Sequence, residues 1–458
     1  MANKKLKISF FGGTEDVTGA NFLIEGDASK GETILVDCGL FQGNRVCEQR
    51  NYDKFPYDPA TANVLFVTHA HLDHVGRIPK LVHEGFRGRI YSTPPTKEIA
   101  EVVLEDSMGI LEKEAKHEGN EMLYNADDIK QAMSLWHTVN YHDPVKIGDL
   151  SIVLRDSGHI LGSAMIEITY GSKKIVFTGD LGNSPAPLLR DTEAVSDATY
   201  VVMESVYGDR NHEDKKTRRD QLEDAIEETM KRGGVLIIPA FSIERTQELL
   251  FEIENMMENS RIPLVPVFLD SPMAIKVTEV YKRYESYFNH DAKYIIDSGD
   301  GIFKFPQFHE TVSTEESRRI DESNQRKIVM AGSGMSNGGR IIHHEKKYLP
   351  DPKSTLLLVG YQEVGSLGRQ LQDGARMVKI LGEIVPVNAK VINISGYSAH
   401  KDSEGLFNFV KNTADTVRRV FVVMGEPKSS LFLVQRIRDY LGVDAIAPHR
   451  NQVIEIEL

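Results

Sequence analysis

Three histidines and an aspartate occupy a stretch of six consecutive positions in this chain, as His69, His71, Asp73 and His74. Imidazole nitrogens and carboxylate oxygens are the ligands of a catalytic zinc or a similar divalent ion. The cluster follows the apolar run 64–67, which reads as a buried strand, so it lies where a strand ends. His69 and His71 can point the same way, while Asp73 and His74 can serve a second ion nearby. A chance polar loop is disfavoured, because side chains of this kind at such density would repel protons and one another without a metal.

Histidine and aspartate recur shortly after other apolar runs, as Asp37, His159 and Asp180. One such residue at a strand end is usually a turn residue or a hydrogen-bonded support. An ordered series that includes the His-rich cluster favours a metal site instead. Asp180 is the candidate to bridge two cations, and Asp37 is expected to support a ligand histidine rather than to bind metal itself.

Short apolar strands alternate with amphipathic helices along the chain. The periodicity predicts helices over 97–117, 218–231 and 246–257, and buried strands over 235–238, 265–269, 328–330 and 356–359. The alternation predicts an α/β sheet of parallel strands in this middle region. The stretch 156–180 is hairpin-like and predicts more antiparallel sheet.

Composition limits the class of protein. The chain has 458 residues, of which 41% are hydrophobic and 26% charged, which suggests two or three globular domains with a sizeable core. A net charge of −13 argues against non-specific coating of polyanions, although a local basic groove and divalent cations can still attract phosphate. Two cysteines are too few for a disulfide framework and indicate a reducing cytosol, so we expect a cytoplasmic protein. No segment has the pattern of a signal peptide or a membrane span.

The ordered set of His and Asp residues resembles the metallo-β-lactamase superfamily, with its HxHxDH motif, a later His and a later Asp. Further motifs are similar to the β-CASP ribonuclease family, which includes bacterial and archaeal homologues of the nuclease subunit of the cleavage and polyadenylation specificity factor. Glu204 in 202–210 and His400 in 395–402 look like two additional motifs of that family. The segments that resemble its inserted domain are 239–242 with Arg245, 270–274, 332–335 and 338–340. The resemblance covers nearly the whole chain.

The resemblance implies an αββα metallo-β-lactamase domain with an inserted α/β β-CASP domain. The first domain would comprise 1–206 and 382–458, and the insert 207–381. It also implies roles for the candidate residues. His69, His71 and His159 would hold a first zinc ion, Asp73 and His74 a second, and Asp180 would bridge them. His400 would protonate the leaving oxygen and Glu204 would orient its imidazole, with Asp73 counted as catalytic as well as ligating.

The implied activity is metal-dependent hydrolysis of single-stranded RNA by a zinc-activated hydroxide, as an endonuclease in RNA processing or decay. Glycines that permit close backbone approach and arginines that offer bidentate contacts could hold phosphate. The residues expected to contact substrate are Arg245, Ser333, Gly334, Gly339 and Arg340. Tyr361 could stack on a base or pack in the core. RNA-processing protein partners and a homodimer are compatible with this interpretation.

Met424 departs from the family pattern, because it stands before Gly425-Glu426 where RNA-cleaving members carry a histidine. A thioether is a poor zinc ligand, so a weak second zinc site is expected. An apolar residue there favours the alternative of a DNA nuclease of the same superfamily. The insert counts against a thioesterase or lactonase, and the retained His-rich cluster counts against a non-catalytic RNA-processing scaffold.

Overall fold

The computed structural model describes residues 4–43, 45–119, 121–212, 215–298, 302–323, 325–360, 362 and 365–458. The chain forms two compact units. Unit 1 comprises Met1–Ala186, Arg190–Asn211 and His400–Leu458, and unit 2 comprises Pro187–Leu189 and His212–Ala399. The domain limits expected from the sequence, at 206/207 and 381/382, stay predictions.

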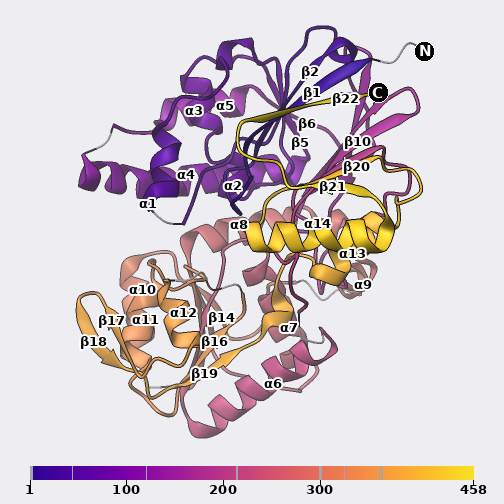
Figure 1. Cartoon of the computed structure of the whole chain (residues 1–458). Coiled ribbons are helices and arrows are strands. Elements are labelled where there is room, and N and C mark those ends of the chain that lie inside the picture. Colours follow the sequence, from indigo (N-terminus) through magenta and orange to yellow (C-terminus); the bar gives the residue numbers. More distant parts are fainter. Residues whose placement is uncertain are drawn as a thin grey trace. The chain divides into compact units, whose positions relative to one another are not determined.

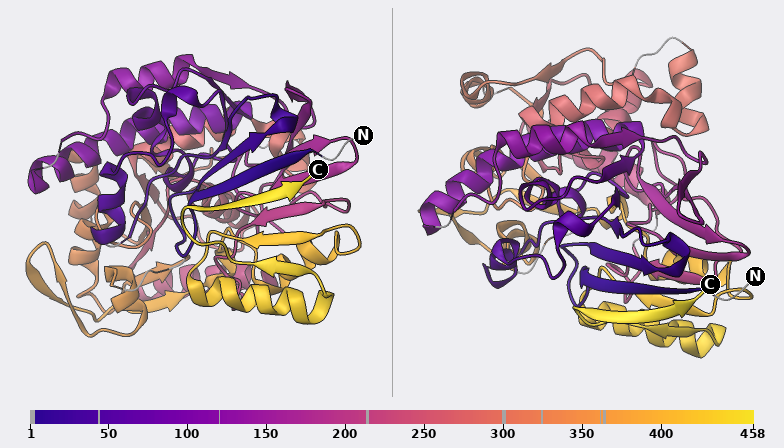
Figure 2. Two further views of the ribbon diagram at one scale, coloured as in Figure 1. Left: turned by 45° about the horizontal axis from the view of Figure 1, so that its top comes forward. Right: turned by 90° about the horizontal axis from the view of Figure 1, so that it is seen from above.

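Unit 1 contains two seven-stranded sheets. The first has the order β22 (Gln452–Glu457), β1 (Lys5–Gly12), β2 (Asn21–Gly26), β3 (Ile34–Val36), β4 (Val64–Phe66), β5 (Arg89–Ser92) and β6 (Trp136–Thr138). The second has the order β21 (Asp444–Ile446), β20 (Arg419–Val422), β11 (Tyr200–Met203), β10 (Lys173–Phe177), β9 (Ala164–Tyr170), β8 (Leu150–Asp156) and β7 (Val145–Ile147). Strands β8, β9 and β10 pair antiparallel, as the hairpin pattern predicts. The last strand, β22, pairs with the first, and Figure 2 shows the two side by side.

The two sheets share a hydrophobic core. Ile8 and Phe22 from the first sheet and Ile152 and Phe177 from the second are buried in one cluster. Helices α13 (Ser403–Lys411) and α14 (Pro427–Leu441) pack on the other face of the second sheet. Helices α3 (Ile78–His83), α4 (Pro94–Glu118) and α5 (Ala126–Ser134) pack together beside the first sheet (Figure 1). The αββα expectation is therefore confirmed.

Local sequence explains the longest helix of unit 1. The hydroxyl of Thr93 accepts a hydrogen bond from the Thr96 amide, and prolines stand in the first turn of α4, where no backbone donor is needed. The helix ends at Gly119, which has a positive φ of 73°. It covers the predicted 97–117 and extends a few residues beyond at its start.

Unit 2 contains a six-stranded sheet and a two-stranded one. The larger has the order β14 (Phe308–Glu310), β13 (Val267–Asp270), β15 (Lys327–Ala331), β12 (Val235–Pro239), β16 (Thr355–Leu358) and β19 (Lys390–Asn393). Every neighbouring pair in it is parallel, which confirms the expectation from the sequence. The smaller pairs β17 (Met377–Ile380) with β18 (Glu383–Pro386).

The helices of unit 2 are α6 (Lys215–Arg232), α7 (Arg245–Glu258), α8 (Pro272–Arg283), α9 (His290–Asp297), α10 (Thr314–Glu322), α11 (Ile341–Tyr348) and α12 (Leu367–Gln372). Short elements complete the described chain: α1 (Arg45–Gln49), α2 (Leu72–Val75), and 3₁₀ turns at Asp27–Ser29, Arg50–Tyr52, Pro59–Thr61, Glu285–Tyr287 and Ser395–Tyr397. Over the described ranges, no helix combines the length and apolarity needed to cross a membrane.

The connections of the unit 2 sheet change direction between two neighbouring strands. From β12 the chain passes β15 to reach β13, whereas from β15 it passes β12 to reach β16. The connections that leave the adjacent strands β12 and β15 therefore run toward opposite edges of the sheet. In open α/β sheets, ligands bind beyond the carboxyl ends of the strands at such a switch point.

Candidate metal centre

The His-rich cluster lies at the carboxyl end of β4, where the strand gives way to the short helix α2. His69 and His71 lie on the connecting turn, and Asp73 and His74 are in the first turn of α2. A side chain at Gly39 would collide with the carbonyl of Asp73, so a glycine there lets the loop after β3 pack directly on the ligand turn. The strand-end placement expected from the sequence is confirmed.

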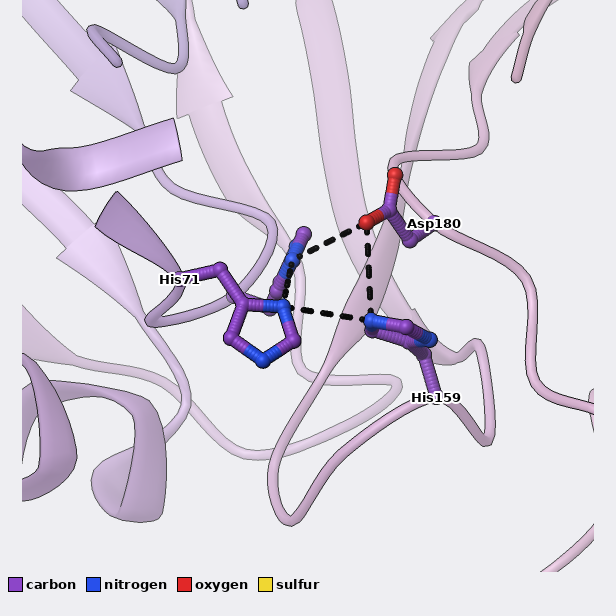
Figure 3. Close-up of side chains that lie close together, drawn as sticks. His71, His159 and Asp180 are labelled. Atoms are coloured by element: carbon purple, nitrogen blue, oxygen red, sulfur yellow. Dashed lines mark hydrogen bonds and ion pairs between the residues drawn. The ribbon is translucent and has the colours of Figure 1, made fainter. Parts of the chain in front are cut away.

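Four donor atoms face one another in what we call the first donor set. His71 Nδ1 is 3.1 Å from His69 Nε2 and 3.3 Å from His159 Nε2. Asp180 Oδ2 is 3.3 Å from His69 Nε2 and 3.4 Å from His159 Nε2 (Figure 3). Tetrahedral zinc with bonds of about 2.0–2.1 Å holds its ligand atoms about 3.3 Å apart. Four separations within the first donor set are therefore close to those between ligands of one zinc ion, and all its donor atoms lie within 4.8 Å of one another.

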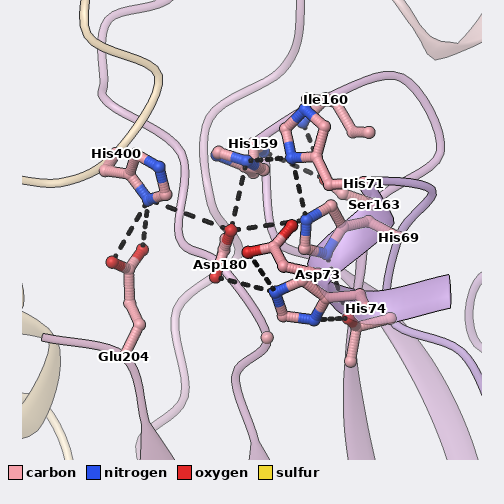
Figure 4. A network of polar contacts seen from close by, with 12 residues as sticks. His69, His71, Asp73, His74, His159, Ile160, Ser163, Asp180, Glu204 and His400 are labelled. Carbon is pink, nitrogen blue, oxygen red and sulfur yellow. Dashed lines mark hydrogen bonds and ion pairs between the residues drawn. The ribbon is translucent and has the colours of Figure 1, made fainter. Parts of the chain in front are cut away.

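Three donors form a second donor set beside the first. His74 Nε2 is 3.5 Å from Asp180 Oδ1 and 3.7 Å from Asp73 Oδ2 (Figure 4). Within the described residues, the buried atoms His74 Nε2 and Asp180 Oδ1 have no hydrogen-bond partner. Buried polar atoms are rarely left so, and a cation would satisfy both. Each oxygen of Asp180 faces a different donor set, as a bridging ligand requires.

Asp37 supports the cluster from behind. Its Oδ2 is 2.7 Å from His74 Nδ1, and it accepts hydrogen bonds from the amide and the hydroxyl of Thr68, each at 2.8 Å. A carboxylate on Nδ1 directs the other ring nitrogen, Nε2, toward Asp73 and Asp180. The geometry agrees with the supporting role that the sequence suggests for Asp37.

Thr68 is a member of this network that the sequence interpretation missed. Its hydroxyl donates to Asp37 and lies 3.0 Å from His69 Nδ1, so it can accept a hydrogen bond from a protonated Nδ1, the tautomer that leaves His69 Nε2 for a metal. Its position directly before His69 was the available signal, but a threonine beside a ligand has no distinctive spacing.

The charges of the centre shift several pKa values. Burial lowers the pKa of His71 and of His159 well below 6.5, which keeps both rings neutral and able to bind a cation. Burial alone would raise the pKa of Asp180, but the neighbouring His74 and His69 hold it well below its usual range. Burial would lower the pKa of His74, yet Asp180, Asp37 and Asp73 raise it well above 6.5. The neutral rings of His71 and His159 beside the ionised Asp180 are the donor chemistry that a divalent cation prefers, whereas His74 must release its proton to bind one.

His400 and Glu204 form a pair at the edge of the donor sets. His400 Nδ1 is 3.3 Å from each Glu204 oxygen and 4.0 Å from Asp180 Oδ2. The Glu204 side chain is fully buried, whereas His400 is 24% exposed and can meet solvent. Burial would lower the pKa of His400, but the charge and hydrogen bond of Glu204 raise it to about 9. The pair can therefore present a protonated imidazole.

Backbone contacts fix this pair beside the bridging aspartate. Glu204 Oε1 accepts a hydrogen bond from the amide of Leu181 at 2.6 Å. Gly182 forms an isolated antiparallel bridge with His400, and the Lys401 amide donates to the Leu181 carbonyl. The segment after Asp180 thus holds both members of the pair.

Met424 lies on the wall of a small pocket that His74, Asp37, Thr68 and Glu204 also line. It is buried, its backbone has a positive φ of 47°, and its sulfur lies against Gly13. The position therefore borders the second donor set, and its thioether packs rather than binds.

The residues expected to contact substrate lie in unit 2. Arg245 forms a buried ion pair with Glu248. Arg340 donates to Asp270 Oδ1 at 2.7 Å and to the carbonyls of Thr311 and Val312. Both guanidinium groups therefore bond to acceptors within unit 2.

The glycine-rich segment follows β15, at the switch point of the unit 2 sheet. Ser333 and Gly334 come directly after this strand, and a side chain at Gly339, where φ is +71°, would collide with the Gly332 carbonyl. The close packing explains the glycine. Tyr361 lies outside the described residues.

A buried His–Asp centre at the strand ends of an αββα unit defines a metallo-hydrolase of the metallo-β-lactamase type. Residues 23–206 match the metallo-beta-lactamase superfamily domain, residues 246–371 the Beta-Casp domain, and residues 384–448 the Zn-dependent metallo-hydrolase RNA specificity domain.

Curated relatives match this chain over nearly its whole length. The chain is 36% identical to ribonuclease TTHA0252 of Thermus thermophilus, over 93% of this chain and 95% of that protein. It is 32% identical to transcription termination factor FttA of Pyrococcus horikoshii, over 98% of this chain and 71% of the relative. An RNase J-like protein of Methanocaldococcus jannaschii is 30% identical, over 98% and 99%. The chain belongs to the β-CASP family of the metallo-β-lactamase superfamily.

A solved structure shares the fold. A protein of unknown function from Enterococcus faecalis superposes with a TM-score of 0.56 at 13% identity, over 99% of this chain and 100% of that one. The family implies a divalent metal, and the two donor sets are groups that could hold one.

Proposed function

We propose that this protein is a zinc-dependent endoribonuclease that hydrolyses phosphodiester bonds of single-stranded RNA. The first donor set is the observation that carries the proposal, since three imidazoles and a carboxylate converge there with neighbouring donor atoms 3.1–3.4 Å apart. The ribonuclease named among the relatives, and the match to an RNA specificity domain, support RNA as the substrate. The chain has two cysteines, Cys38 and Cys47, too few for a disulfide framework, which supports a reducing cytoplasmic setting.

The residues of the centre would have separate roles in hydrolysis, as metal ligands, proton donor and supports of the ligand rings. His69, His71, His159 and Asp180 would hold one ion, and Asp73, His74 and Asp180 a second. Divalent ions there would supply water of lowered pKa and neutralise phosphate charge. His400, fixed by Glu204, donates its proton to the oxygen that leaves the scissile phosphate. Asp37 and Thr68 hold the ligand rings so that their nitrogens stay aimed at the donor sets.

The distribution of polar groups supports this division. His69, His74, His159 and Asp180 are buried, whereas the side chains of Asp73 and His400 are 19% and 24% exposed, and His400 lies 3.3 Å from the buried carboxylate of Glu204. A proton donor must reach both the solvent that recharges it and the atom that it serves. His400 is both open to solvent and in contact with the buried Glu204.

The test uses circular and linear single-stranded RNA, with linear and circular single-stranded DNA of the same sequence. A closed circle has no end, so its linearisation requires internal cleavage. We expect RNA circles to be cut by protein that contains zinc, with metal content measured on the same sample. Cleavage of DNA but not RNA would favour the DNA nuclease, for which Met424 is the supporting observation. Failure to cut either polymer with zinc bound would overturn the proposed activity.

A further inference from the structure

Phe241 is an exposed aromatic ring in an otherwise buried stretch of unit 2. It follows β12 at the carboxyl end of the sheet, beside the switch point between β12 and β15. Its neighbours Ala240 and Ser242 are buried, yet Phe241 is 39% exposed. Exposure alone does not distinguish this ring, since Phe432 is 49% exposed, but Phe241 lies at the switch point, where open α/β sheets bind ligands.

Two glycines make room for the ring. A Cβ atom built on Gly334 would lie 2.6 Å from a ring carbon of Phe241, and one built on Gly360 would lie 3.3 Å away. The buried Gln362 joins these glycines, because its Nε2 donates to the carbonyls of Gly334 at 3.0 Å and Gly360 at 3.2 Å. The ring therefore lies against the backbone of Gly334 and Gly360, which we call the glycine wall. The side chain of Gln362 bonds to both of these glycines.

The backbone beneath the ring is also fixed. The Phe241 carbonyl accepts hydrogen bonds from the Thr246 amide at 3.3 Å and the Thr246 hydroxyl at 2.8 Å. Gln247 Nε2 donates to the carbonyl of Ser242 at 3.2 Å. Both donors lie in the first turn of α7. A ring that lies against glycine backbone on a segment anchored to a helix, and that is 39% exposed, is pre-organised to receive another flat group.

We propose that Phe241 is a stacking platform for a nucleobase of the RNA substrate, an inference that rests on the proposed function. A phenyl face attracts any of the four bases through its π surface, so it contributes affinity without selecting sequence. This role suits the glycine-rich segments beside the ring, which offer few side chains to read base edges. Gln362 acts as the positioning residue that keeps the glycine wall in place.

The test compares Phe241→Leu, which keeps an apolar side chain without a π face, with Phe241→Trp, which enlarges it. Full-length proteins in chelator bind short single-stranded oligoribonucleotides in which 2-aminopurine is moved along the sequence, and stacking quenches its fluorescence. We expect native protein and Phe241→Trp to quench the probe at one position. Phe241→Leu should lose the quenching and bind about 5- to 100-fold more weakly, as for the loss of one stacked base.

Metal-loaded enzymes supply a second readout. Phe241→Leu should raise KM by a similar factor with kcat near native, since the ring binds substrate and does not touch the reacting atoms. Phe432→Ala is the matched control, because Phe432 is an exposed phenyl ring, 49% accessible, in unit 1. If native protein binds and cuts RNA but Phe241→Leu matches it in quenching, affinity and KM, the platform is refuted while the proposed function stands. If native protein neither binds nor cuts RNA, both fail.

Discussion

At the scale of single residues, the centre depends on buried groups that hold one another in fixed protonation states. Asp37 and Thr68 determine which ring nitrogens face the donor sets, and Asp180 shares its two oxygens between them. His400 pairs with Glu204, which belongs to neither donor set. Ligand and acid can therefore be separated by experiment.

His71→Ala and His400→Ala should fail in different ways. Removing His71 deletes one corner of the first donor set, so bound zinc and activity should fall together. Removing His400 leaves the donor sets intact, so zinc should stay bound while kcat falls by about 100-fold or more, the usual contribution of a positioned proton donor. Metal analysis and single-turnover kinetics on the same samples check this. Loss of zinc from His400→Ala would show that His400 is a ligand.

Met424→His should strengthen the second donor set, which has three protein donors against four in the first. After dialysis we expect roughly one firmly held ion per native chain, because affinity falls with ligand number. The substituted protein should approach two ions and need less added metal for full activity, with little change in maximal rate. Met424→Leu, which keeps an apolar side chain, is the control. Two tightly held ions in the native protein would contradict the expectation.

At the scale of elements, the strand-end placement of the ligands was predictable, because apolar runs, turns and metal-binding side chains occur in order along the sequence. The contacts of Arg245 and Arg340 were not. A sequence shows that an arginine is present, but its partners Glu248 and Asp270 are brought to it by helix geometry and by a neighbouring strand. The surroundings of Phe241 could not be predicted for the same reason, because Gly334 and Gly360 lie in loops that follow other strands.

A buried charge cluster at the end of β13 should make unit 2 sensitive to pH. His344 lies 2.8 Å from Asp270 and 3.0 Å from Asp321. Burial alone would lower the pKa of His344, but these hydrogen bonds raise it to about 9. A raised pKa means that the pairing stabilises the fold fully below the unfolded value of about 6.5 and is lost as pH rises through about 9.

The measurement is urea unfolding of native protein and His344→Gln at pH 6.5 and pH 9.5. Native protein should be more stable than the variant at pH 6.5, by up to about 3 kcal/mol, and the difference should shrink at pH 9.5. Asp270, whose pKa is held at about 2 by partners that outweigh its burial, stays ionised at both values. A difference that is unchanged between the two pH values would show that His344 contributes by packing alone.

At the scale of the whole molecule, metal joins parts of unit 1 that are distant in sequence. The donor sets draw on the turn after β4, the loop after β8 and the loop after β10. An ion bound there stabilises the native state alone, because the unfolded chain does not assemble the site. The family match supports a divalent metal in this unit, while the assignment of its ligands, self-association and protein partners stay predictions.

Chelation should therefore lower both activity and stability. Metal-free protein should lose RNA cleavage and unfold at a lower temperature, and zinc should restore both. Calorimetry and cleavage assays on the same preparation check this, with His71→Ala as the control whose unfolding temperature should respond little to zinc. Full activity of a sample shown to be metal-free would exclude the proposed mechanism.

The pairing of β11 with β20 has a consequence for synthesis on the ribosome. These strands are neighbours in the second sheet, although all but three residues of unit 2 lie between them in the sequence. The main segment of unit 2 emerges as one uninterrupted run and can fold while unit 1 still lacks β20 and His400. A nascent chain at that stage carries the candidate metal ligands without the proton donor. On the proposed function, this incomplete enzyme should cut RNA, including the messenger that encodes it, far more slowly than the finished protein.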